Sequence, residues 1–178
     1  MSIPNILSIF RIVLIPVFIV CYLMLPDEMG WVPALVLVVS GATDVVDGYI
    51  ARHFNMVTQL GKVLDPLADK LTLAAVVITV AINIPMLIPL AVIYVAKELL
   101  MLIGGLLIVK SGIKIQSSKW FGKLATVVFY IAMFIIILVP GLPQAVTVFL
   151  AALVAVMVLF AFGMYVNEFV KIKRTNHK

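Results

Sequence analysis

Charged residues are scarce in this sequence, and cysteine and histidine are almost missing. Lys, Arg, Asp and Glu make up 12% of the 178 residues, against 65% hydrophobic residues. A soluble domain carries about 25% charged residues, so this composition excludes an ordinary soluble protein and predicts several membrane spans. The single cysteine, Cys21, excludes a disulfide within the chain. With only His53 and His177 beside it, a zinc site is not expected.

Six stretches are apolar and long enough to cross a bilayer, which takes roughly 20 residues. We expect them at 6–25, 31–52, 62–82, 86–110, 120–139 and 144–170. They predict an all-α integral membrane fold. No linker or repeat divides the chain, which predicts a single domain of residues 1–178.

The charges lie at alternating ends of these spans. The connectors at 26–30, 83–85 and 140–143 lack Lys and Arg, whereas the other span ends are basic. Because basic loops stay in the cytoplasm, both termini should lie on the cytoplasmic side of the cell membrane. The net charge of +5 then suits anionic lipid head groups, and no nucleic-acid partner is expected.

Arg11 interrupts the first span. Only residues 12–25 follow it, too few to cross without a tilt. We expect Arg11 near the inner interface, either reaching for the head groups or facing a polar cavity. Apolar residues between Ile3 and Phe10 recur at helical spacing, which predicts a short N-terminal interfacial segment before the chain turns inward.

Four aspartates fall within or beside the second and third spans. Asp44 and Asp47 are three residues apart, and Asp65 and Asp69 are four apart, so each pair shares one helix face. A carboxylate at the bilayer centre costs about 2.5–3.5 kcal/mol, so these groups need compensation. A short turn around 55–59 joins the two spans, which predicts neighbouring antiparallel helices with both pairs near the cytoplasmic end.

Three arrangements would compensate these carboxylates. Hard oxygen ligands suit Mg²⁺, Mn²⁺ or Ca²⁺, and two such ions would balance the charge. Salt bridges to Arg52, Lys62 and Lys70 would also serve, as would a cation pathway in a transporter. Small residues line one side of the second span: Gly41, Ala42, Gly48 and Ala51. They favour the metal site, because a phosphorylated ligand can approach the backbone there.

Residues 44–69 match a known pattern. The run D-V-V-D-G-Y-I-A-R, eight further residues and G-K-V-L-D-P-L-A-D resemble the CDP-alcohol phosphotransferase signature, D-x2-D-G-x2-A-R-x8-G-x3-D-x3-D. Every fixed position is present: Asp44, Asp47, Gly48, Ala51, Arg52, Gly61, Asp65 and Asp69. The opening Ile3-Pro4-Asn5, followed by Ser8 and Arg11, is similar to the start of bacterial phosphatidylglycerophosphate synthases. The run from Asp65 to Lys70 is similar to them too.

This resemblance implies six membrane helices, a homodimer and an active site open to the cytoplasm. It implies transfer of a phosphatidyl group from CDP-diacylglycerol to an alcohol, with two divalent ions, Mg²⁺ or Mn²⁺. Asp44, Asp47 and Asp65 are implied metal ligands, and Asp69 is the implied general base with a share in metal binding. The positions implied around the CDP-lipid are Asp44, Gly48, Ala51, Arg52 and Gly61.

The acceptor pocket is expected in later spans, with glycerol 3-phosphate as the expected acceptor. The candidates for binding it are Arg11, Lys97 and Lys123. Lys97 lies well inside the fourth span, where it either pairs with helical neighbours or binds an anion. The synthases usually carry Arg-Glu where this chain has Lys97-Glu98, a further Arg in the fourth span, and a second Lys after the position of Lys123. Because two cations are missing, phosphatidylglycerol is the alternative acceptor. With that acceptor the protein would be a cardiolipin synthase of the CDP-lipid type. A cation-coupled transporter is the remote alternative.

Overall fold

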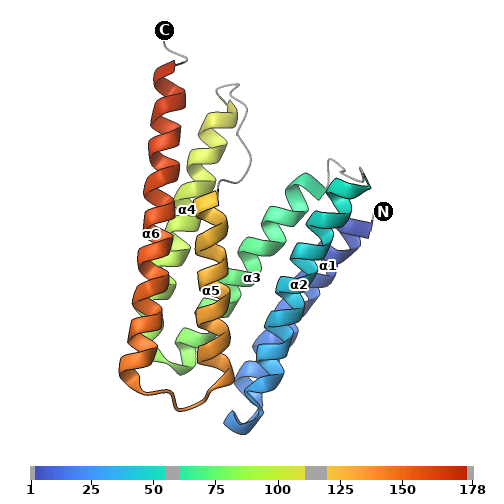
Figure 1. Cartoon of the computed structure of the whole chain (residues 1–178), viewed down its shortest axis with the longest axis vertical. Coiled ribbons are helices and arrows are strands. Elements are labelled where there is room, and N and C mark those ends of the chain that lie inside the picture. Colours follow the sequence, from blue (N-terminus) through green and yellow to red (C-terminus); the bar gives the residue numbers. More distant parts are fainter. Residues whose placement is uncertain (1–2, 55–60, 111–119, 176–178) are drawn as a thin grey trace.

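The computed structural model describes residues 3–54, 61–110 and 120–175, and these ranges hold six long helices and no strand (Figure 1). The helices are α1 (Ile3–Met24), α2 (Trp31–His53), α3 (Gly61–Asn83), α4 (Ile88–Lys110), α5 (Trp120–Leu138) and α6 (Gln144–Thr175). Short 3-10 turns, η1 (Asp27–Met29) and η2 (Pro85–Leu87), precede α2 and α4. The predicted all-α fold with six helices is confirmed, because each expected span coincides with one helix.

The exterior of the bundle is apolar. Within the described ranges, five helical stretches are long and apolar enough to cross a membrane, in α1, η1–α2, η2–α4, α5 and α6. Large apolar side chains are exposed along these helices, for example Val20, Leu102 and Phe149. The remaining helix, α3, carries Asp65, Asp69 and Lys70 in its first half. This is the fold of an integral membrane protein.

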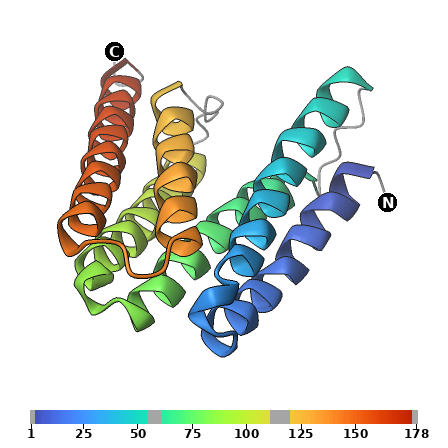
Figure 2. The ribbon, with the colours of Figure 1, turned by 60° about the horizontal axis from the view of Figure 1, so that its bottom comes forward.

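α1 lies between α2 and α3. It packs along both of them, whereas α2 and α3, which run antiparallel, touch each other only slightly (Figures 1 and 2). The two helices thus run antiparallel and touch, as expected, but α1 makes far more extensive contact with each of them than they make with each other. The turn expected around 55–59 lies outside the described residues. A buried polar face of α1 explains the insertion, because its side chains meet the aspartates on both flanking helices.

α1 also corrects the expectation for the N-terminal segment. The helix is continuous from Ile3 through Arg11 to Met24, so no separate interfacial segment precedes the span. Asn5, Ser8 and Arg11 recur every three residues and are buried, and the Arg11 side chain is 0% exposed. Arg11 thus faces the interior of the bundle and does not reach for the head groups.

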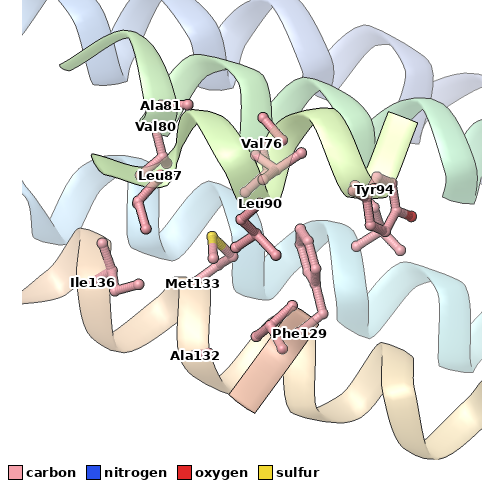
Figure 3. Close-up of a cluster of buried hydrophobic side chains, with 14 of the residues drawn as sticks. Val76, Val80, Ala81, Leu87, Leu90, Tyr94, Phe129, Ala132, Met133 and Ile136 are labelled. Atoms are coloured by element: carbon pink, nitrogen blue, oxygen red, sulfur yellow. The ribbon is translucent and has the colours of Figure 1, made fainter. Parts of the chain in front are cut away.

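An apolar core fills the other end of the bundle, between α3, α4 and α5. Val80, Leu87 and Met133 are completely buried there, and Leu90 and Phe129 pack beside them (Figure 3). This core fixes the second half of α3 and so sets where its first half, with Asp65 and Asp69, meets α1.

Candidate active site

Arg11 joins the two aspartates of α2. Its Nη1 donates to Asp44 Oδ1 at 2.6 Å, and its Nη2 donates to Asp47 Oδ2. The three-residue spacing of the aspartates presents both carboxylates to one guanidinium fork. Asp47 is 3% exposed, whereas Asp44 is 41% exposed. The cluster is therefore closed on the side of Asp47 and open on the side of Asp44.

A second α1 residue contacts the first aspartate of α3. The Ser8 hydroxyl bonds Asp65 Oδ1 and lies 3.0 Å from the carbonyl oxygen of Pro4. Ser8 is one helical turn before Arg11, so both side chains leave the same face of α1. In this way α1 supplies a partner to Asp44, Asp47 and Asp65.

Asp69 is the exception. Its Oδ1 is buried and has no hydrogen-bond partner among residues 3–54, 61–110 and 120–175. Its carboxylate lies within electrostatic range of Asp44 and Arg11. Asp47 in turn interacts with Asp44 and Asp65. The four aspartates singled out in the sequence are thus gathered at one end of α1, α2 and α3.

The donor chemistry of this cluster fits a divalent cation. All four side chains offer carboxylate oxygens, the ligands that Mg²⁺ and Mn²⁺ prefer, and Asp69 Oδ1 is an unsatisfied acceptor. In the described part of the chain, no three His, Cys, Asp or Glu side chains are yet arranged to hold one ion. Arg11 lies among the carboxylates and supplies the compensating positive charge in this arrangement.

The small residues of α2 and α3 differ in burial and in what they pack against. Gly48 and Ala51 are partly buried on α2, and Gly61 is buried at the start of α3. Gly41 faces α5, because a Cβ there would lie 3.2 Å from Cε1 of Tyr130. Gly41 therefore serves helix packing, and the expectation that it bares the helix for a ligand is not supported. The side chain of Arg52 lies outside the described residues.

The mid-span lysine of α4 is paired. Lys97 contacts its chain neighbour Glu98, and the second oxygen of Glu98 lies 2.6 Å from Nζ of Lys70 on α3. Lys97 Nζ also sits 4.9 Å from the centre of the Tyr94 ring, a cation–π contact. One carboxylate therefore holds two lysines. Glu98 is also within electrostatic range of Asp69, which places this group beside the aspartate cluster.

The other two candidates for binding the acceptor, Lys123 and Arg11, are not part of the group formed by Lys97, Glu98 and Lys70. Lys123 is exposed in the first turn of α5, and Arg11 is committed to Asp44 and Asp47. A cavity of about 310 Å³ lies at the opposite end of the helices, where Tyr22, Asp27 and Gln144 are among the residues that line it. It contains none of the aspartates of the cluster and is not the candidate active site.

Sequence reasoning missed three contributions to the site. Ser8 was noted only for its resemblance, and Lys70 only as a salt-bridge option and as the last residue of a resembling run. Tyr130, whose hydroxyl lies within electrostatic range of Asp69, was not noted at all. The signal for Ser8 was its three-residue spacing from Asn5 and Arg11, which marks a polar stripe on an apolar helix. Tyr130 lies in an apolar run whose composition gives no such signal.

The fold and this cluster define an integral membrane protein with a buried acidic site between three helices. The family model described as CDP-alcohol phosphatidyltransferase matches residues 1–166. The chain belongs to this family, which confirms the resemblance found in the sequence.

Curated relatives carry a common name, CDP-diacylglycerol–glycerol-3-phosphate 3-phosphatidyltransferase. The protein from Rickettsia bellii is 46% identical over 77 residues, which cover 43% of this chain and 42% of the relative. The protein from Haemophilus influenzae is 32% identical over 106 residues, 56% of this chain and 55% of the relative. The protein from Salmonella typhimurium is 38% identical over 82 residues, which cover 44% of this chain and 43% of the relative. The chain spans about half the length of these relatives in the matched regions.

Proposed function

We propose that this protein transfers the phosphatidyl group of CDP-diacylglycerol to glycerol 3-phosphate, giving phosphatidylglycerophosphate and CMP. The observation that carries the proposal is the gathering of four family-motif aspartates around Arg11. The relatives' names support the choice of donor and acceptor.

The aspartates and the small residues are proposed to contact different parts of the CDP-diacylglycerol donor. Two divalent ions, Mg²⁺ or Mn²⁺, would be held by Asp44, Asp47, Asp65 and Asp69. The metal would neutralise the negative charge of the diphosphate and of the leaving CMP. Gly48, Ala51 and Gly61 let the CDP moiety approach the helix backbone. Arg52 is expected to bind diphosphate oxygens through its guanidinium fork. The partly exposed Asp44 marks the side from which the donor enters.

Asp69 is the residue proposed to move the proton. Its unpartnered carboxylate oxygen accepts the proton of the acceptor hydroxyl. The acceptor oxygen then forms a bond to the β-phosphorus as the bond from that phosphorus to the CMP oxygen breaks. The products are a phosphodiester, CMP and a protonated Asp69, which returns its proton to solvent.

The lysines held by Glu98 are proposed to bind the phosphate of the acceptor. Lys70 and Lys97 share one carboxylate, so the group keeps a net positive charge beside Asp69. A phosphate monoester carries more negative charge than a phosphodiester and so binds this positive group more strongly. The group therefore favours glycerol 3-phosphate over phosphatidylglycerol. Lys123 and Arg11 remain secondary candidates. The cations missing from α4 and α5 are the observation in favour of phosphatidylglycerol, whose use would make the protein a cardiolipin synthase.

The arrangement of the helix ends supports one orientation in the membrane. The start of α1, the end of α2, the start of α3 and the end of α6 lie toward the same end of the bundle (Figure 1). The positive-inside rule places the basic ends of the helices in the cytoplasm. We therefore place both termini and the active site on the cytoplasmic side, and we expect a homodimer by family likeness.

CMP release by the purified protein tests this function. Glycerol 3-phosphate and phosphatidylglycerol are offered separately with CDP-diacylglycerol and Mg²⁺ or Mn²⁺. Asp69→Asn should abolish release, whereas Asp27→Asn, an aspartate in the exposed turn η1, should not. Release with phosphatidylglycerol alone would reassign the acceptor. No release with either acceptor would overturn the proposal.

A further inference from the structure

Four unpartnered polar atoms from four helices belong to one neighbourhood. Among the described residues, the buried side-chain atoms without a hydrogen-bond partner include Arg11 Nε, Ser40 Oγ, Asp69 Oδ1 and Tyr130 Oη. The Tyr130 hydroxyl lies within electrostatic range of Asp69 and Arg11, and Ser40 is near it. Buried polar groups in folded proteins are nearly always hydrogen-bonded, so a group of such atoms marks a place of function.

The Tyr130 ring is fixed in this place by packing. It lies against Gly41 of α2, where even a Cβ would come within 3.2 Å of Cε1. The preceding residue, Phe129, is 1% exposed and packs on Tyr94 with ring centres 5.2 Å apart. The backbone of α5 is therefore held from both sides, and the phenol hydroxyl has a defined position near the end of α3 that bears Asp69.

Tyr130 is also the donor best suited to Asp69. Two of the guanidinium nitrogens of Arg11 are already committed to Asp44 and Asp47. A phenol offers a neutral O–H donor, so it can bond one carboxylate without drawing the other carboxylates toward it.

We infer that Tyr130 is a positioning residue, whose hydroxyl donates a hydrogen bond to the Asp69 carboxylate, directly or across one water, and aims Asp69 at the acceptor hydroxyl. The inference rests on the proposed role of Asp69 as the proton acceptor. α5 thereby contributes to a site whose aspartates and their Arg11 partner lie on α1, α2 and α3.

A kinetic experiment tests the consequence for the reaction. Tyr130→Phe removes the hydroxyl and keeps the packed ring. We expect kcat to fall about 10- to 100-fold, the scale of a misaligned reacting group, with KM for CDP-diacylglycerol unchanged within about twofold. Tyr22→Phe, the same change at the far cavity, should leave both constants unchanged. An unchanged kcat in Tyr130→Phe would overturn the inference, as would a loss confined to KM.

Nuclear magnetic resonance tests the hydrogen bond without any turnover. The chain has five tyrosines, so labelling their Cζ atoms with ¹³C gives five signals, and Tyr130→Phe identifies the one from Tyr130. Asp69→Asn should shift this signal and leave that of Tyr22 in place. A Tyr130 signal unmoved by Asp69→Asn would overturn the inference even if the protein releases CMP. Failure of the proposed function would appear separately, as a wild-type protein that releases no CMP.

Discussion

The two ends of the helix bundle are stabilised by different interactions. At the end that contains the motif, Arg11, Ser8 and the aspartates join α1 to α2 and α3 through buried polar contacts. At the other end, α3, α4 and α5 meet through apolar side chains such as Leu87 and Met133. α1 is thus joined to α2 and α3 by charged and polar groups that the proposed reaction needs, whereas the apolar end has no part in that reaction.

The polar end is also the less satisfied of the two. Buried atoms of Arg11, Asp69 and Tyr130 lack partners there, whereas no buried side-chain polar atom lacks a partner among the described residues of the other end. Unsatisfied groups at a functional site lower stability and are retained for their chemistry. Loss of an unpartnered group at the polar end should therefore lower activity without lowering stability, whereas changes at the apolar end should lower stability without lowering kcat per folded molecule.

The largest separation is expected at Asp69. Asp69→Asn removes the proposed proton acceptor, so kcat for CMP release should fall about 10²- to 10⁴-fold. The thermal unfolding midpoint in detergent should stay level or rise, because Asp69 Oδ1 has no partner to lose and sits near another carboxylate, Asp44. A variant that lost stability in step with activity would contradict the division between the two ends.

Arg11 tests the reverse case, a polar residue on which folding depends. Arg11→Met leaves the buried Asp47 uncompensated, which should lower the free energy of unfolding by about 3–5 kcal/mol. Mg²⁺ or Mn²⁺ should restore much of the loss, because a cation then neutralises the carboxylates. Unfolding curves with and without the ion measure both effects. Arg11→Lys, which keeps the charge but not the two-pronged geometry, should fall between the wild type and Arg11→Met.

Leu87 is the matched test at the apolar end. This side chain is 0% exposed, so Leu87→Ala should lower the free energy of unfolding by about 2–5 kcal/mol through lost contacts and a cavity. Divalent ions should not restore this loss, and kcat per folded molecule should stay near that of the wild type. If the ion rescued Leu87→Ala as well as Arg11→Met, the rescue would be a general effect unrelated to the aspartates.

Sequence patterns predicted the helices and the members of the site better than the contacts between them. Hydropathy placed every helix within a few residues, because a lipid solvent leaves few other choices. The spacing of Asp44, Asp47, Asp65 and Asp69 predicted their gathering, because helical periodicity is regular. The insertion of α1 was not predicted, since chain connectivity favours α2 beside α3 and no local pattern reports which helix packs between two others.

Contributions from distant segments were the least predictable part of the site. Arg11 was expected near the inner interface, either reaching for head groups or facing a polar cavity, and no sequence pattern named its partners. Its true partners are 33 and 36 residues away, beyond the reach of any helical period. Tyr130 is farther still from the motif and carries no charge to mark it. Long-range packing decides the positions of Arg11 and Tyr130, and local periodicity in the sequence does not predict such packing.

The smallest expected effect concerns Lys97, at the border between the two ends. Lys97→Gln should raise KM for glycerol 3-phosphate about tenfold, the scale of one lost charge-assisted hydrogen bond. KM for CDP-diacylglycerol should not change, and Lys97→Arg should restore acceptor binding in part. Because Lys97 also pairs with Glu98, Glu98→Gln serves as the control: it breaks the same ion pair but frees the lysine, so its KM for glycerol 3-phosphate should not rise. Equal defects in Lys97→Gln and Glu98→Gln would show that the pair only joins α3 to α4, and the acceptor phosphate would then have to be bound elsewhere.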